Sequence, residues 1–399
     1  MKLSNRILQM QASPIRKLVP YAEAAKKQGK KVYHLNIGQP DIETPQVFFQ
    51  AVKHFDSKVL AYSFSQGMPE LIDAMIDYYK RYGIEYLQNQ ILITNGGSEA
   101  LMFALIATCD IGDEVLVPEP FYTNYNGFSL PIGVKIAPMA TYAEEGFALP
   151  PLAKMEKYVT PRTKAILLSN PGNPTGAVYD KTQVEAVCAL ALAHNLFIIA
   201  DEVYREFIYD GLEYTSFGSC EAVADRVIIV DSISKRYSAC GARIGSIASK
   251  NTALIANVLK LCQSRLCVPT LEMVGAIELY KTDNAYFQAV NKEYTARRDI
   301  VYEALCSMPG VVCKQPKGAF YVIAKLPVLD AEDFVVWLLK EFDVNGETVM
   351  FAPAAGFYAT PGMGVDEVRM AYVLKKEDLQ AAMNILKAAL EVYPQRSIR

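Results

Sequence analysis

The chain has 399 residues, of which 51% are hydrophobic and 21% are charged, and its formal net charge at pH 7 is −3. This balance is typical of a globular protein, and the length predicts two domains with a large core. The absence of a long basic run argues against nucleic-acid binding, and no apolar stretch reaches the ~18 residues that a membrane span requires.

The first segment with chemical content is Thr94–Ala104, where a strand predicted at 91–93 runs through two glycines into an apolar-periodic helix. Exposed N–H groups at a helix N-terminus bind anions, and glycines let the backbone approach them closely. Gly97, Ser98 and Glu99 are therefore candidate anion ligands. Glycine turns with serine caps are common, so this motif gains weight only from its companions.

A second segment, Ser169–Gly176, follows an apolar strand predicted at 165–168. Two Asn-Pro pairs and two glycines in eight residues predict a rigid, non-helical loop, with a cis bond before Pro174. Such a loop holds the Asn173 amide still, ready to donate a hydrogen bond to a ligand oxygen. The alternative is an ordinary surface turn.

Asp201 ends the apolar run 196–200 and is followed three residues later by Tyr204. The carboxyl end of a buried strand is where ligands collect in open α/β sheets. A buried aspartate there can keep a pyridine nitrogen protonated, which turns the ring into an electron sink. The alternative is a helix N-cap, a common role for Asp after a strand.

Lys235 is the most informative residue, because a β-branched run at 227–230 leads it into a hydroxyl-rich turn with Ser232 and Ser234, and Arg243 follows closely. An amine condenses with an aldehyde, while arginine and serine match phosphate oxygens. Pyridoxal 5'-phosphate carries both groups and a pyridine ring. A lone lysine at a strand end is most often a surface residue, and it is the neighbouring groups that favour the cofactor.

Together these segments resemble the class I/II aminotransferases, the fold-type-I pyridoxal-phosphate enzymes, over almost the whole chain. Asn-Pro-x-Asn-Pro-Thr-Gly, Asp-Glu-x-Tyr, Ser-x-Ser-Lys and Gly-x-Arg-x-Gly occur in the order and spacing of that family. The resemblance implies that Lys235 is the Schiff-base lysine and acid/base catalyst. It further implies that Asp201 partners the pyridine nitrogen, that Asn173 and Tyr204 partner the ring hydroxyl, and that Arg243 binds the phosphate.

The resemblance extends to four more residues. Tyr122 matches the aromatic residue that stacks on the ring, and Arg369 matches the arginine that grips the α-carboxylate of the amino acid in a bidentate fork. Gly38 matches a backbone position beside the bound substrate, which Asn173 also borders. Tyr62 matches a tyrosine that reaches the phosphate of the neighbouring subunit, which implies a homodimer with shared sites.

Two positions depart from the family pattern. Ala242 precedes Arg243 where many relatives carry tryptophan, which affects local packing. Ser98 stands where an aspartate-specific subgroup has a lysine for the distal carboxylate. Aspartate with 2-oxoglutarate is the substrate pair suggested by overall similarity, but it then requires another cation, which the sequence does not identify.

Strand-like and helical patterns alternate over residues 46–285, which predicts an α/β large domain whose mostly parallel sheet is sandwiched by helices. Helices are expected at 70–82, 183–194 and 252–260. A long helix at 286–307, followed by antiparallel strands at 311–313 and 319–324, predicts a smaller α+β domain. The resemblance adds the N-terminal segment to it, so the small domain is discontinuous, comprising 1–45 and 286–399. A loop at 355–364 is expected to order over the substrate.

Eight cysteines without Cys-x-x-Cys spacing favour reduced thiols, and none of the three histidines stands at ligand spacing, so no metal site is predicted. The segment Met1–Arg6 lacks the apolar core of a secretory signal. We therefore expect a cytoplasmic protein that binds small molecules.

The expected reaction is transamination in two half-reactions, from an L-amino acid to a 2-oxo acid. The nearest alternative is another pyridoxal-phosphate enzyme on the same fold, a carbon–sulfur β-lyase or a β-decarboxylase, which differs in the bond aligned with the ring. A more distant alternative is a non-catalytic regulatory protein that binds the cofactor.

Overall fold

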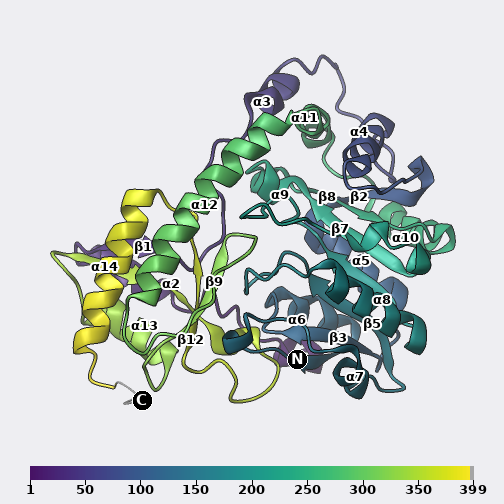
Figure 1. The fold of residues 1–399 in the computed structure, drawn as a ribbon. Helices are drawn as coiled ribbons and strands as arrows, with labels where there is room; N and C mark the ends of the chain where they lie inside the picture. The colour runs from purple at the N-terminus through teal and green to yellow at the C-terminus, as the bar shows by residue number, and fades with distance from the viewer. Residues whose placement is uncertain (396–399) are drawn as a thin grey trace.

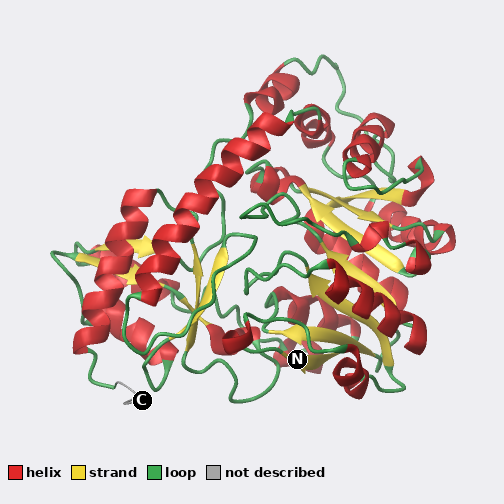
Figure 2. Cartoon of the chain, viewed as in Figure 1, coloured by secondary structure: helices red, strands yellow, loops and turns green. Residues whose placement is uncertain are grey.

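The computed structural model describes residues 1–395, and a seven-stranded sheet forms the centre of its larger part (Figures 1 and 2). Along the sheet the strand order is β2-β8-β7-β6-β5-β3-β4. Neighbours from β7 to β4 run parallel, and only β8 runs antiparallel to both of its neighbours, which confirms the mostly parallel sheet. The strands are β2 Ile91–Asn95, β3 Glu114–Glu119, β4 Lys135–Ala140, β5 Thr163–Ser169, β6 Phe197–Asp201, β7 Val227–Ser232 and β8 Ile244–Ala248.

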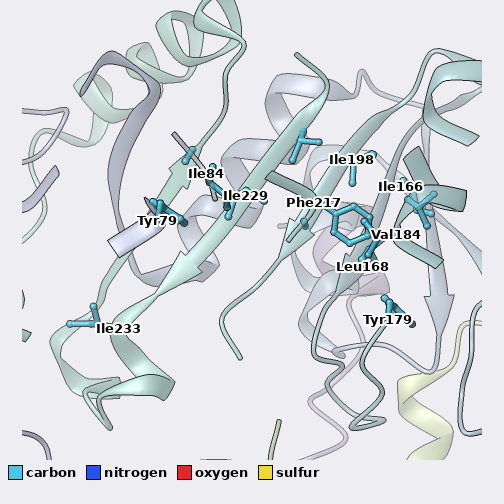
Figure 3. Packing of buried hydrophobic residues seen from close by; sticks show 14 of the residues in the cluster. Tyr79, Ile84, Ile166, Leu168, Tyr179, Val184, Ile198, Phe217, Ile229 and Ile233 are labelled. Atoms are coloured by element: carbon cyan, nitrogen blue, oxygen red, sulfur yellow. The ribbon is translucent and has the colours of Figure 1, made fainter. Parts of the chain in front are cut away.

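The central strands are apolar on both faces, because helices cover both sides of the sheet. Alternate residues of one strand enter different clusters: Ile166 and Leu168 pack on one face, and Leu167 packs on the other. Figure 3 shows the first cluster, in which Ile198 and Ile229 from neighbouring strands lie with the side chains of covering segments. The core of this part is therefore two apolar layers separated by the sheet.

Helices α4 Pro69–Lys80, α8 Lys181–His194 and α11 Thr270–Tyr280 supply the first layer, and α5 Gly96–Thr108, α6 Asn124–Ser129 and α10 Thr252–Arg265 supply the second. Local signals set their bounds. Asp180 caps α8 by accepting from the Gln183 N–H at 2.9 Å, and Asn195 in the left-handed region ends it. The helices expected near 70–82, 183–194 and 252–260 are confirmed.

The smaller part combines a segment that follows α1 (Asn5–Gln9) with the C-terminal segment of the chain, whereas the N-terminus itself lies beside the larger part, near α6 (Figure 1). Strand β1 Lys31–His34 pairs in parallel with β10 Glu347–Met350, and β12 Glu367–Ala371 lies antiparallel between β11 Ala352–Pro353 and β9 Tyr321–Lys325. Helices α2 Val19–Lys27, α12 Asn284–Cys306, α13 Ala331–Lys340 and α14 Lys376–Val392 pack with these strands in one apolar cluster. The remaining helices are α1 Asn5–Gln9, α3 Gln46–Lys53, α7 Leu152–Met155 and α9 Ile233–Arg236.

The sequence predicts a long helix from residue 286 and a strand at 311–313 in the smaller part. The long helix expected from residue 286 is confirmed as α12. The strand expected at 311–313 is wrong, because only Val312 pairs, through an isolated bridge with Lys325. Residues 396–399 of the predicted small domain lie outside the described part of the chain. Among residues 1–395, no helix has the length and apolar content needed to cross a bilayer.

Candidate active site

One cavity of about 410 Å³ collects side chains from both parts of the chain. Its volume lies within the usual range of small-molecule sites. Asp201 and Lys235 both line it, although 34 positions separate them, because β6 and β7 are parallel neighbours that end at the same sheet edge. Twelve of the fourteen residues predicted for the site line it: Gly38, Gly97, Ser98, Tyr122, Asn173, Asp201, Tyr204, Ser232, Ser234, Lys235, Arg243 and Arg369.

Lys235 lies in α9, which begins directly after β7. The Ser232 side chain caps this short helix by accepting from the Ser234 N–H at 3.1 Å. The Lys235 Nζ atom donates to the Gly38 carbonyl at 3.0 Å and lies 3.8 Å from the Cys240 Sγ atom. Within residues 1–395 no carboxylate forms a salt bridge with this amine, so an arriving carbonyl group meets no ion pair that must first be broken.

Asp201 is 5% exposed at the end of β6. Its carboxyl accepts from the Tyr125 hydroxyl at 3.0 Å and from the Val203 N–H at 3.4 Å. Both hydrogen bonds lower its pKa, but burial dominates and raises the pKa to about 7. A cation placed beside this carboxyl would restore its charge, as a protonated ring nitrogen would.

Two serine hydroxyls and the Arg243 guanidinium line the cavity beside the start of α5. The Ser232 and Ser234 hydroxyls are 2.7 Å apart, and Ser232 also donates to the Ile244 carbonyl at 3.0 Å. Arg243 adopts φ +55° and donates to the Cys240 carbonyl at 3.0 Å. Gly96 adopts φ +72°, and a Cβ atom at this position would overlap the Arg243 guanidinium. An added Cβ atom would push the guanidinium aside, so glycine lets the N-terminus of α5 and this arginine lie close together.

Arg369 is a buried cation on β12, 2% exposed. It donates to the Asn36 carbonyl and to the Asn173 Oδ1 atom, the latter at 3.3 Å, and its guanidinium lies 4.7 Å from the centre of the Tyr321 ring. Burial lowers its pKa, and among residues 1–395 no carboxylate pairs with it and its Nε atom has no hydrogen-bond partner. A buried arginine in this state is ready to receive a carboxylate.

The aromatic residues surround these charged groups. The Tyr204 and Tyr321 hydroxyls lie 2.9 Å apart, and a Cβ atom at Gly38 would overlap the Tyr321 side chain. Tyr122 accepts from the Asn124 side-chain amide at 2.7 Å, and burial raises the pKa of Tyr122 to about 12. Burial also raises the pKa of Tyr204, so Tyr122 and Tyr204 are neutral hydrogen-bonding groups at physiological pH.

Two predicted site residues lie elsewhere. The Glu99 carboxylate accepts from the Asn95 N–H at 2.8 Å and pairs with Arg265 at 3.2 Å, because an acidic side chain in the first turn of a helix caps that helix. The structure thus does not bring its side chain to the cavity, and a role for its backbone N–H stays a prediction. Tyr62 is 80% exposed and does not line the cavity.

The sequence reasoning missed three residues that support the site. Tyr125 holds Asp201, Tyr321 packs against Gly38, and Asn36 holds Arg369. A tyrosine one helical turn after Tyr122 was the available signal for the first. Residues 355–364, expected as a loop over the substrate, do not line the cavity, and Phe357 instead packs 5.0 Å from the Arg369 guanidinium.

Comparisons with known proteins identify the family of the chain. The family model for aminotransferase class I and II matches residues 30–384. Aspartate aminotransferase of Pyrococcus horikoshii is 31% identical, covering 98% of this chain and 97% of the relative, and aromatic-amino-acid aminotransferase 2 of Thermococcus litoralis is 30% identical, covering 98% and 99%. The solved structure of alanine aminotransferase from Pyrococcus furiosus superposes with a TM-score of 0.89 at 31% identity, covering 98% of this chain and all of that one. The chain belongs to the class I and II aminotransferase family.

Proposed function

We propose that the protein transfers the amino group of an L-amino acid to a 2-oxo acid, with pyridoxal 5'-phosphate as its cofactor. The observation that carries this proposal is the shared cavity of Lys235, Asp201, Arg243 and Arg369. These are an amine, a carboxyl and two guanidinium groups, and each matches a different functional group of the cofactor or of an amino acid.

The residues present fit this cofactor. The anion site of Arg243, Ser232 and Ser234 matches a phosphate, and Gly96 keeps the backbone close to it. The carboxyl of Asp201, with its raised pKa, matches a basic ring nitrogen. Tyr204 and Asn173 both line the cavity and can donate to a ring oxygen. We therefore assign these six side chains to cofactor binding, with Tyr122 as the stacking partner of the ring.

When bound, pyridoxal phosphate supplies an aldehyde that condenses with amines and a ring that accepts electron density from the α-carbon of an amino acid. Arg369 binds the α-carboxylate and fixes the orientation of the substrate, because a bidentate pair leaves little rotational freedom. The Lys235 amine, when free, would take a proton from the α-carbon of the substrate and deliver it to the cofactor carbon that carried the aldehyde. Asp201 holds a proton at the ring nitrogen throughout.

The relatives do not settle the substrate, since their names cover aspartate, aromatic amino acids and alanine. Our proposal for the donor and acceptor is aspartate with 2-oxoglutarate. A lyase on the same scaffold would release product from the amino donor alone, whereas a transaminase needs an oxo acid to complete its cycle.

We further propose the division of the chain into a large domain, 46–285, and a small domain of 1–45 with 286–399. The pairing of β1 with β10 supports the discontinuous small domain. We also propose a homodimer. Tyr62 stands in an exposed apolar stretch with Val59, Leu60 and Phe64, which are 72%, 61% and 67% exposed. Such a patch is typical of an interface, and it would let Tyr62 reach the phosphate in the partner's cavity.

The decisive variant is Lys235→Ala, with Lys260→Ala on the exposed face of α10 as the control. We expect the purified Lys235→Ala protein to lose the visible absorbance of its covalently held cofactor and to lose about 10³-fold or more in turnover of aspartate with 2-oxoglutarate. Lys260→Ala should keep both. Normal turnover in Lys235→Ala would refute the assignment, and product formed without any oxo acid would favour the lyase.

A further inference from the structure

The cationic side chains around the cavity outnumber the roles assigned so far. Arg16, Lys235, Arg243 and Arg369 line it, and Asp201 is the acidic residue in the same lining. Under the proposed function, Lys235 reacts with the aldehyde, Arg243 binds the phosphate and Arg369 binds the α-carboxylate. Arg16 remains without an assigned anion.

Arg16 is available to a ligand. It is exposed, and among the described residues no carboxylate pairs with it and no hydrogen bond engages its guanidinium. The adjacent cation, Lys17, is already paired with Glu332 and does not line the cavity. Of these two neighbouring cations, therefore, Arg16 is the one that presents a charge without an ion-pair partner to the cavity.

The backbone segment of Arg16 is anchored to Arg369, the residue proposed to bind the α-carboxylate. Asn36, which is fully buried, donates through its side-chain amide to the Ile15 carbonyl at 3.1 Å, and its own carbonyl accepts from Arg369. Asn36 thus links the residue before Arg16, through its side chain, to the arginine proposed to hold the substrate, through its backbone carbonyl. The anchoring is tertiary, since positions 15, 36 and 369 are far apart in sequence.

A second contact seats the same segment. The N–H groups of Arg16 and Lys17 both donate to the Ser13 carbonyl at 3.0 Å, which closes a turn around Pro14. Pro14 packs against Gly356, where a Cβ atom would overlap the proline ring. Gly356 directly precedes Phe357, the ring that packs against Arg369. The turn that carries Arg16 is therefore held to the surroundings of Arg369 from two sides.

From this arrangement we infer that Arg16 binds the side-chain carboxylate of dicarboxylic amino acids and oxo acids. The inference rests on the proposed function and deepens it. Position 98 supplies no charge for this purpose, since Ser98 is the residue that lines the cavity there. Arg16 provides the further cation that acidic specificity requires, from the N-terminal segment instead of from α5. A neutral or aromatic substrate would leave this guanidinium without a partner.

The test compares Arg16→Gln with Lys17→Gln in the cofactor-loaded enzyme. Half-reaction rates are followed through the visible spectrum, using aspartate against asparagine and glutamate against glutamine, pairs that differ in charge but hardly in size. A charge-assisted hydrogen bond on an exposed arginine predicts that Arg16→Gln lowers kcat/KM for both acids by about 10- to 100-fold and leaves both amides within about threefold. Lys17→Gln should leave all four substrates unchanged.

A binding measurement separates recognition from turnover. Succinate keeps two carboxylates, and butyrate keeps one on a chain of the same length. Calorimetric titration should show succinate affinity falling by about 10- to 100-fold in Arg16→Gln while butyrate affinity stays constant.

An equal loss for acids and amides, or an unchanged succinate affinity, would overturn the inference. A wild-type enzyme that converts alanine or asparagine but shows no preference for acids would overturn it while leaving the aminotransferase proposal intact. A wild-type enzyme whose spectrum responds to no amino acid would overturn both.

Discussion

Asp201→Asn is expected to stabilise the cofactor-free protein while removing its activity. The pKa of Asp201 is raised from its ordinary value of 3.8 to about 7, chiefly by burial. Below pH ~4 both the folded and the unfolded chain hold this proton. As the pH rises from ~4 to ~7 the unfolded chain loses it first, so the wild-type protein loses stability over this window, and above ~7 the loss is complete.

The magnitude follows from the shift. Each pKa unit corresponds to about 1.4 kcal/mol, so the rise of the Asp201 pKa from 3.8 to about 7 lowers the unfolding free energy of the wild type above pH ~7 by about 4 kcal/mol. Asparagine carries no charge, so the Asp201→Asn protein does not lose this free energy. It keeps an acceptor for the Tyr125 hydroxyl, but its amide NH₂ faces the Val203 N–H, which costs about 1–3 kcal/mol. The net gain above pH 7 is therefore about 1–3 kcal/mol, and it turns into a net loss below pH ~4.

The assay is urea unfolding of the cofactor-stripped wild-type and Asp201→Asn proteins at pH 5, 6, 7 and 8 and at one protein concentration. The difference in unfolding free energy should grow with pH up to ~7 and then level off. Asp110→Asn, at an exposed turn, serves as the control and should show no such growth. A difference between wild type and Asp201→Asn that does not vary with pH would refute the reasoning.

The proposed cofactor should reduce the stability difference between these two proteins. A protonated ring nitrogen beside Asp201 stabilises the carboxylate, so adding pyridoxal phosphate should stabilise the wild type more than Asp201→Asn. An equal gain for both would argue that Asp201 does not face the ring.

Two further substitutions test the cofactor site. Gly96→Ala should weaken pyridoxal phosphate binding by about tenfold or more, because the added Cβ atom overlaps the Arg243 guanidinium and the φ of +72° disfavours alanine. Gly241→Ala is the control and should leave binding unchanged, since the space around Gly241 is open. Titration of the cofactor-stripped proteins with pyridoxal phosphate measures both. Tyr62→Phe should weaken the same binding by about tenfold through the partner subunit while Tyr142→Phe, another exposed tyrosine, leaves it unchanged. Unaltered affinity in Tyr62→Phe would count against shared sites.

Sequence patterns were sufficient for the groups that stand at strand ends. Asp201 and Lys235 each follow a continuous apolar run, and parallel neighbours bring such positions together without further information. The Asn-Pro loop was equally readable, because proline restricts the backbone around Asn173. These predictions depend on local chemistry and on one topological rule.

What failed or was missed depends on tertiary packing. The first-turn position of Glu99 is a local signal for helix capping, but its pairing with Arg265 depends on the packing of α10 against α5. The segment of Arg16 is linked to Arg369 through Asn36, which bridges segments more than 300 residues apart. Such contacts leave no periodic signal, so the cation beside the substrate site could not be found before the fold was known.

The charges of the cavity argue for a ligand that carries both signs. Asp201 and Arg369 line the same cavity and both are buried, yet within residues 1–395 they form no salt bridge with each other or with another residue. Burial raises the pKa of Asp201 and lowers that of Arg369, so it favours the neutral form of each group. This loss of solvation lowers the stability of the folded chain. A fold selected for stability alone would pair them or replace them. Their separation is explained if a ligand brings a cation to one and an anion to the other, as a protonated pyridine ring and an amino-acid carboxylate do together.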